Sequence, residues 1–269
     1  MPIVTRLIEK IDERKDEKNQ IQVSGDSYIA FSGGVESTCL TLMFHKKAKP
    51  LFADTGWEHD ELYKWIETVE NRLGIEVIRV RPQHETLPQY IRRMKFYPSG
   101  MARFCTRIFK IEPMDAFLAE KVPCELMIGL NAEESDRTGN HGLVEGVRYS
   151  YPLIDLGVTR KYCIDVLREY DLLPRFPGYM RRGGCVGCFW KSKREYAVMA
   201  VESPEEADDV ASIEQEIQDE RGKFYSIRDG IRNMRKFIEE ERRQKRIDFG
   251  PEYDDMGDIP TSCGVFCRR

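Results

Sequence analysis

The chain has 269 residues, of which 41% are hydrophobic, and this is enough for one sizeable domain with a buried core. Its net charge of −4 gives no general attraction to nucleic acid, and the lack of a run of about 18 apolar residues excludes a membrane-spanning helix. Residues 1–20 are charged and have neither the apolar core nor the cleavage site of a secretory signal, so we expect a cytoplasmic protein with no membrane partner.

The first half of the chain alternates between short apolar segments and segments with helical spacing. After a short amphipathic helix over 4–11, compact apolar runs predict buried strands at 28–31, 50–54, 75–80 and 124–129. Helical spacing predicts helices at 36–46, at 62–73 and after Pro113. Short strands that alternate with helices imply right-handed crossovers and a mainly parallel sheet flanked by helices, so the predicted fold class is α/β.

Beyond residue 155 the sequence becomes more helical and more charged. A helix is expected over 159–170, and capping-box patterns predict three further helix starts at Ser192, Ser203 and Ser226. We therefore divide the chain into an N-terminal helix and linker, a nucleotide-binding α/β domain with a cysteine site, a helical region and an irregular cysteine-containing tail, at 1–27, 28–190, 191–247 and 248–269.

The segment Ser32-Gly33-Gly34-Val35-Glu36-Ser37-Thr38 lies where the first strand ends and a helix begins. Glycines let the backbone approach a ligand closely, and the N–H groups at the start of a helix attract anions. Ser32, Ser37 and Thr38 add hydroxyl donors. The segment therefore predicts a binding site for a pyrophosphate or a sulfate.

The eight cysteines fall into two groups. Cys39, Cys124 and Cys163 stand singly in apolar segments and are expected in the core. Clustered cysteines in a reducing compartment indicate metal or redox chemistry. The cysteines to be explained in this way are Cys105, Cys185, Cys188, Cys263 and Cys267.

Three segments together resemble the phosphoadenosine-phosphosulfate reductase family. Residues 32–38 are similar to the PP-loop of the adenine nucleotide alpha-hydrolase-like superfamily, with Glu36 where Asp is usual. Asp54-Thr55-Gly56 resembles the family element that contacts the adenosine half of the nucleotide. Residues 129–137 resemble the element Gly-x-Arg-x-x-Glu-Ser-x-x-Arg, with Asn131 in place of the first Arg and Arg137 shifted by one position. The resemblance implies an adenine-nucleotide ligand and the corresponding parallel fold.

The resemblance extends to the cysteines. The stretch 103–113 resembles the family segment that carries a Cys-Cys pair, although here Phe104 leaves only Cys105. Cys185-Val-Gly-Cys188 matches the pair that completes a four-cysteine [4Fe–4S] site in adenylyl-sulfate reductases. The fourth ligand is then Cys263 or Cys267, or an open position. Zinc and redox-active or structural cysteines remain the alternatives.

The resemblance supports the family more firmly than one reaction. In the first hypothesis, ATP is split to AMP and pyrophosphate to drive sulfur transfer to tRNA or DNA. A cysteine desulfurase would be the sulfur source, and Glu36 or Glu58 would bind Mg²⁺. The basic segment 242–246 favours this hypothesis. In the second, the chain reduces an adenylated sulfate, with Cys263 as the nucleophile and a thioredoxin-like reductant. A nucleotide- or cluster-binding sensor without catalysis is the third.

Particular side chains carry these hypotheses. A strongly anionic nucleotide needs cationic partners, and the expected phosphate-binding residues are Arg107 and Lys110. The predicted catalytic residues are Glu36, Lys110, Arg137 and Cys263, and the predicted nucleotide contacts are residues 32–34, 36–38, 54–56, Arg107 and Gly129. A homo-oligomer is compatible with the sequence.

Overall fold

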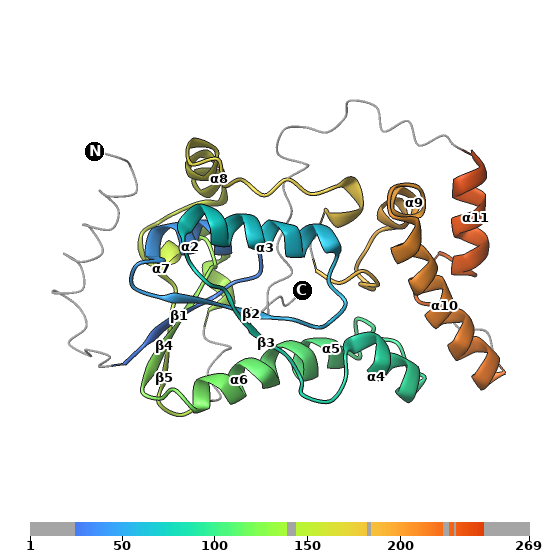
Figure 1. Cartoon of the computed structure of the whole chain (residues 1–269), viewed down its shortest axis with the longest axis horizontal. Coiled ribbons are helices and arrows are strands. Elements are labelled where there is room, and N and C mark those ends of the chain that lie inside the picture. The colour runs from blue at the N-terminus through green and yellow to red at the C-terminus, as the bar shows by residue number, and fades with distance from the viewer. Residues whose placement is uncertain (1–24, 139–143, 182–183, 223–225, 229, 245–269) are drawn as a thin grey trace.

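A single sheet of parallel strands forms the centre of the molecule (Figure 1). The computed structural model describes residues 25–138, 144–181, 184–222, 226–228 and 230–244. Its strands are β1 (Ser27–Ala30), β2 (Lys49–Ala53), β3 (Ile78–Val80), β4 (Cys124–Ile128) and β5 (Val147–Ser150). Every neighbouring pair is parallel and the order is β3-β2-β1-β4-β5, which confirms the predicted α/β fold class.

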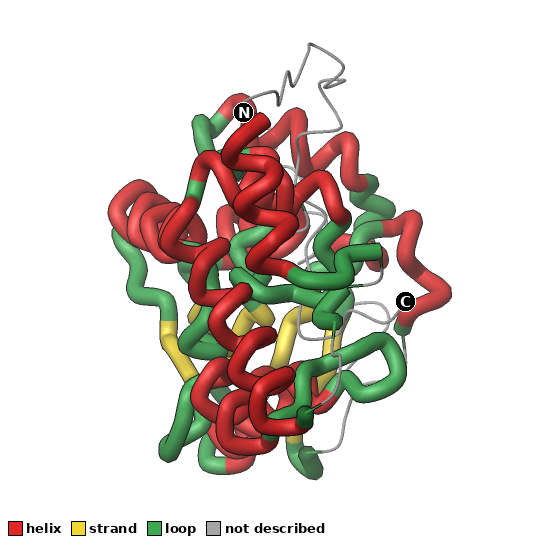
Figure 2. Tube along the Cα trace, turned by 90° about the vertical axis from the view of Figure 1, so that its right-hand side faces the viewer, coloured by secondary structure: helices red, strands yellow, loops and turns green. Residues whose placement is uncertain are grey.

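Helices cover both faces of the sheet. In Figure 1, α2, α3 and α8 lie on one face, α6 lies on the other, and α9, α10 and α11 gather at one end. Figure 2, turned by 90°, shows helical segments on both sides of the strands. The helices are α2 (Val35–Phe44), α3 (Asp60–Leu73), α4 (Leu87–Met94), α5 (Phe104–Thr106), α6 (Glu112–Ala119), α7 (Pro152–Asp155), α8 (Arg160–Glu169), α9 (Lys193–Glu202), α10 (Pro204–Arg221) and α11 (Met234–Gln244). The described residues also form a π-helical turn, η1 (Arg107–Ile111), and two 3-10 helices, η2 (Ala132–Arg137) and η3 (Gly178–Met180).

Alternation along the strands divides the apolar residues between two cores, because successive side chains point to opposite faces of a sheet. Ile29, Phe52 and Met127 belong to the core beneath α2, α3 and α8. The opposite core, beneath α6, contains Tyr28, Leu51, Ala53, Leu126 and Ile128 together with Met114 and Leu118. Both faces of the strands are buried, which explains why β1, β2 and β4 read as continuous apolar runs.

The C-terminal helices share the first of these cores. Met199 of α9, Ile213 of α10 and Phe237 of α11 are buried in it. Polar contacts add to this packing: Arg92 of α4 donates to Asp209 (2.8 Å) and Glu216 of α10. None of the helices in the described ranges is long and apolar enough to cross a bilayer.

Some predicted elements differ from those observed. The helix expected at Ser226 begins at Met234, and β5, α4 and the η1 turn were not predicted. Cys39, Cys124 and Cys163 are fully buried, as expected. The helix predicted over 4–11 and the tail 248–269 lie outside the described residues, and the division into four segments stays a prediction.

The strand order creates a switch point between β1 and β4. From β1 the chain proceeds to β2 and β3 on one side, and then crosses to β4 and β5 on the other. Ligands of open parallel sheets bind outside the carboxyl ends of the strands at such a point. The PP-loop (residues 32–38) directly follows β1, and Gly129 directly follows β4, so both predicted nucleotide elements lie there.

Candidate nucleotide-binding site

The PP-loop makes a tight turn between β1 and α2. Gly33 has φ +75°, in the left-handed region that favours glycine, and a Cβ there would lie 2.6 Å from Leu62 Cδ1. Gly34 is the N-cap of α2 in extended conformation. Ser37 Oγ accepts from Ser32 N (3.2 Å) and donates to Gly34 O (3.1 Å), so the hydroxyls hold the turn closed.

Two polar atoms in this first turn are buried without a hydrogen-bond partner among the described residues. They are Thr38 Oγ1 and Glu36 Oε2. Buried polar groups are normally satisfied, so an unpartnered pair beside a helix N-terminus fits a site that is completed by a ligand.

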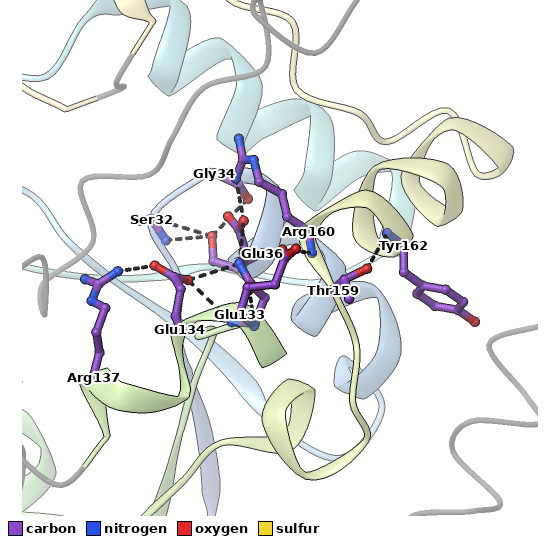
Figure 3. A network of polar contacts seen from close by, with 11 residues as sticks. Ser32, Gly34, Glu36, Glu133, Glu134, Arg137, Thr159, Arg160 and Tyr162 are labelled. Carbon is purple, nitrogen blue, oxygen red and sulfur yellow. Dashed lines mark hydrogen bonds and ion pairs between the residues drawn. The ribbon is translucent and has the colours of Figure 1, made fainter.

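Glu36 is the centre of a network that connects three segments (Figure 3). Its Oε1 atom accepts from Arg160 Nη1 and from Asn131 Nδ2 (3.3 Å). Asn131 Oδ1 in turn accepts from Glu133 N (2.9 Å), and Glu134 pairs with Arg137. The predicted residues Glu36 and Arg137 are therefore linked through the segment that follows β4.

Gly129 brings that segment against the start of α2. A Cβ at Gly129 would lie 3.2 Å from Ser37 N and 3.3 Å from Glu36 C. A larger residue would push back the N–H groups that an anion would contact. The glycine therefore has a packing role in the site.

The segment Asp54-Thr55-Gly56 turns sharply at the end of β2. Asp54 Oδ1 accepts from Gly56 N (2.8 Å) and from the Tyr63 hydroxyl (2.7 Å), and Gly56 has φ +68°. Burial and this hydrogen bond raise the pKa of Tyr63, so the phenol stays a donor. The Asp54 carboxylate thereby stabilises the turn.

A cavity of about 240 Å³ opens beside this turn. Residues 54–56, 81–86 and Gln89 line it, so it lies between the segments that follow β2 and β3. Pockets for drug-sized ligands measure roughly 300–1,000 Å³. The cavity therefore suits one part of a nucleotide, such as a base or a ribose.

The cysteine pair lies next to the same turn. Cys188 N donates to Cys185 O (3.2 Å), and the backbones of Cys185 and Glu58 form an isolated antiparallel β-bridge. Thr55 Oγ1 lies 3.4 Å from Cys185 Sγ and donates to Glu58 Oε1 (3.0 Å). Thr55 thus joins the nucleotide motif to the cysteine motif. Desolvation and the Glu58 carboxylate raise the pKa of the Cys185 thiol.

The structure does not gather the whole predicted ligand set. Among the described residues, no three His, Cys, Asp or Glu side chains come together as metal ligands. Cys105 lies in α5, and Cys263 and Cys267 lie outside the described residues. The cluster therefore stays a prediction.

The expected phosphate-binding cations have acidic partners. Lys110 Nζ lies 3.8 Å from Glu58 Oε1, and its side chain is 14% exposed. Arg107 is largely exposed and pairs with Glu112 at 3.4 Å. Lys110 sits on the π-helical turn η1, an irregularity frequent at functional sites. Of the two, Lys110 is the one placed beside the cysteine pair.

Sequence reasoning missed two groups, Arg160 and His59. Arg160 was not singled out, and the only local signal is a cation at the first position of a helix. His59 was not singled out either, although it is fully buried and its Nδ1 lies 2.6 Å from Glu206 Oε2. Burial and the Lys191 ammonium lower the pKa of His59 to about 4. Glu206 is 147 residues away in sequence, so no local pattern reveals the contact.

The basic segment near the C-terminus has a structural role in part. Arg242 Nε donates to Ala200 O and Arg242 Nη2 to Pro204 O, both at 2.8 Å. Arg242 Nη1 also pairs with Asp208 at 3.0 Å. Arg242 therefore fastens α11 to α9 and α10, which weakens the interpretation of 242–246 as a nucleic-acid contact.

Comparison with known proteins gives one family match. Residues 26–150 match the family model for the phosphoadenosine phosphosulfate reductase domain. An uncharacterised protein of Methanocaldococcus jannaschii is 34% identical over 116 residues, which are 40% of this chain. That match spans only 23% of the length of the relative.

Two solved structures show a distant likeness. A phosphoadenylyl-sulfate reductase of Candida auris, in a phosphate complex, is 14% identical with a TM-score of 0.47, covering 62% of this chain and 85% of that one. An NH3-dependent NAD synthetase of Campylobacter jejuni is 13% identical with a TM-score of 0.40, covering 83% of this chain and 96% of that one. The matched residues 26–150 contain β1 to β5, the PP-loop and the Asp54-Thr55-Gly56 turn. Over these residues the chain is similar to the phosphoadenosine phosphosulfate reductase domain family.

Proposed function

We propose that this chain is an enzyme that binds an adenine nucleotide across the carboxyl ends of β1, β2 and β4. The observation that carries the proposal is the PP-loop at the switch point, with the left-handed Gly33 and the buried, unpartnered hydroxyl of Thr38. The anionic end of the nucleotide would lie on the N–H groups at the start of α2, and the adenosine half beside Asp54-Thr55-Gly56.

The reaction that we propose is ATP-driven sulfur transfer. An acceptor oxygen would attack the α-phosphorus of ATP and release pyrophosphate, and a hydrosulfide would then replace that oxygen on the acceptor as AMP leaves. Carboxylate oxygens suit Mg²⁺, and both Glu36 and Glu58 have a buried Oε2 atom without a partner among the described side chains. Of the two, Glu58 would hold the Mg²⁺ of a bound ATP, because Glu36 already forms an ion pair with Arg160.

Sulfonucleotide reduction is the second candidate, because residues 26–150 match the model of the reductase domain family. The Cys263 thiolate would attack the sulfate sulfur, the adenine nucleotide would leave, and a thioredoxin-like dithiol would reduce the thiosulfonate to release sulfite. The contact between Thr55 and Cys185 supports both reactions, because a nucleotide bound at Thr55 would lie beside a cysteine sulfur. The tRNA or DNA acceptor, the desulfurase, the cytoplasmic location and the oligomeric state stay predictions.

Titration calorimetry under anaerobic conditions tests the function directly. We expect heat of binding with ATP–Mg²⁺, release of pyrophosphate once an acceptor is supplied, and release of AMP once hydrosulfide is added as well. Tighter binding of adenylyl sulfate or phosphoadenylyl sulfate, with sulfite as the product, would replace this reaction by the reductase. Binding of a nucleotide with no turnover under any condition would support the sensor, and no binding at all would contradict the nucleotide site.

The cluster is proposed for the same site, with Cys185 and Cys188 as two of its ligands and Cys105 and a tail cysteine as the others. A bound cluster would supply iron-held sulfide next to the nucleotide. Anaerobically purified protein is then expected to be brown, with about four irons per chain. A C185S/C188S double variant should lose the iron, whereas the core variant Cys124→Ala should keep it. Colourless protein with stoichiometric zinc would contradict the cluster.

A further inference from the structure

Glu36 puts a buried negative charge inside a site built to attract anions. It lies in the first turn of α2 and is only 3% exposed. A carboxylate so close to the anion-binding N–H groups repels a phosphate or a sulfate, and the repulsion is strong because little water screens it. The site therefore requires something that cancels this charge.

Arg160 supplies the cancelling charge. Its Nη1 atom pairs with Glu36 Oε1, and the side chain is mostly buried (Figure 3). The same Oε1 atom accepts from Asn131 Nδ2. The carboxylate is thus fixed from two sides, by the start of α8 and by the segment after β4.

The position of Arg160 in α8 indicates that its charge stabilises Glu36 of α2 rather than α8 itself. It is the first residue of α8, where a positive side chain opposes the helix dipole. The Thr159 side chain already caps this end by accepting from Tyr162 N (3.3 Å). Helix α8 packs along α2, which brings Arg160 to Glu36 across 124 residues of sequence.

We propose that Arg160 is a positioning residue of the nucleotide site, which holds Glu36 in place and neutralises it so that an anion can occupy the PP-loop. The inference rests on the proposed nucleotide-binding function. It assigns Glu36 to a charge pair, and it predicts that the affinity for an anionic nucleotide depends on Arg160 only while Glu36 carries its charge.

The test is a double-mutant cycle by calorimetry, with ATP–Mg²⁺ and with adenylyl sulfate as probes. Arg160→Gln is expected to weaken the binding of an anionic nucleotide about tenfold or more, because it leaves a buried carboxylate uncompensated. Adding Glu36→Gln should restore the affinity to within about threefold of the Glu36→Gln single variant. The matched control is Lys161→Gln, the next cation on α8, which pairs with Asp165 and should bind like wild type.

The outcomes are distinguishable. If the wild type binds no probe, the proposed function fails. If it binds and Arg160→Gln binds equally well with a lower melting temperature, the role of Arg160 is purely structural and the inference is overturned. Loss of ATP–Mg²⁺ binding in Glu36→Gln alone would make Glu36 a metal ligand and would also overturn it. If Arg160→Gln does not fold, comparison of the double variant with Arg160→Lys, which retains the charge, decides the question.

Discussion

Replacing Gly187 by alanine is expected to destabilise the protein by about 2–3 kcal/mol and to lower its melting temperature by roughly 5–10 °C. Gly187 lies inside the turn between Cys185 and Cys188. A Cβ there would lie less than 3.0 Å from the hydroxyl oxygen of Tyr97 and from the ring of Trp57. Both side chains are buried, and the Tyr97 hydroxyl donates to the Gly187 carbonyl. The turn would therefore have to move.

The displacement should also reach the cysteine pair. Val186 N donates to Trp57 O (2.9 Å), so a shift of Trp57 or of the turn separates Cys185 from Glu58 and Thr55. We expect thermal unfolding by circular dichroism to show the stability loss and metal analysis to show reduced iron. Gly100→Ala is the control, because its Cβ would meet Trp190 at an ordinary 3.7 Å. An unchanged melting temperature in Gly187→Ala would contradict the prediction, because it would show that the turn accommodates the methyl group with no loss of stability.

The sequence predicted the centre of the sheet because burial imposes a clear pattern there. Strands β1, β2 and β4 are short and apolar, whereas β5 (Val147–Ser150) lies at the edge, is only partly buried and has no comparable run. The helix α4 did carry a local signal, since Thr86 and Gln89 form a capping box at its start. That signal lies in a stretch with no predicted element.

The helix predicted at Ser226 shows how tertiary contacts override a local motif. The Ser226 hydroxyl donates to Arg228 O and to Ile231 O, which closes a turn in place of a helix cap. Glu214 of α10, which is buried, accepts from Ile227 N and from Met234 N. These contacts hold the chain out of helical conformation until Met234. The carboxylate that does so cannot be identified from the residues around Ser226.

The residues of the candidate site also fall into those that a local motif predicts and those that only tertiary contacts reveal. Motifs predicted the residues that lie on one continuous segment, such as the PP-loop and Asp54-Thr55-Gly56. Their partners come from distant segments: Arg160 reaches Glu36, and Cys185 reaches Thr55. A single sequence contains the two halves of each contact but nothing that pairs them. Only the fold therefore showed that Thr55 of the Asp54-Thr55-Gly56 motif contacts the cysteine pair.

The PP-loop itself is most sensitive at Gly33. Gly33→Ala is expected to weaken nucleotide binding at least tenfold and to destabilise the protein by about 2 kcal/mol. The substitution imposes a left-handed backbone on alanine, and the new methyl group would meet Leu62, which is buried in α3. Relief of this clash must tilt the turn, which moves the N–H groups at the start of α2 away from the anion.

A second glycine, Gly74, provides a control that distinguishes the effect of backbone strain from the effect of the location in the PP-loop. Gly74, at the end of α3, also has positive φ (+64°), and a Cβ there would meet nothing within 4 Å. Gly74→Ala should therefore lose about 1 kcal/mol from strain and keep wild-type nucleotide affinity. Calorimetry and thermal unfolding of the two variants side by side decide the matter. Equal affinities would mean that the nucleotide does not depend on the turn at Gly33. Loss of affinity confined to Gly33→Ala would locate the anion at the start of α2, because the backbone strain is common to both.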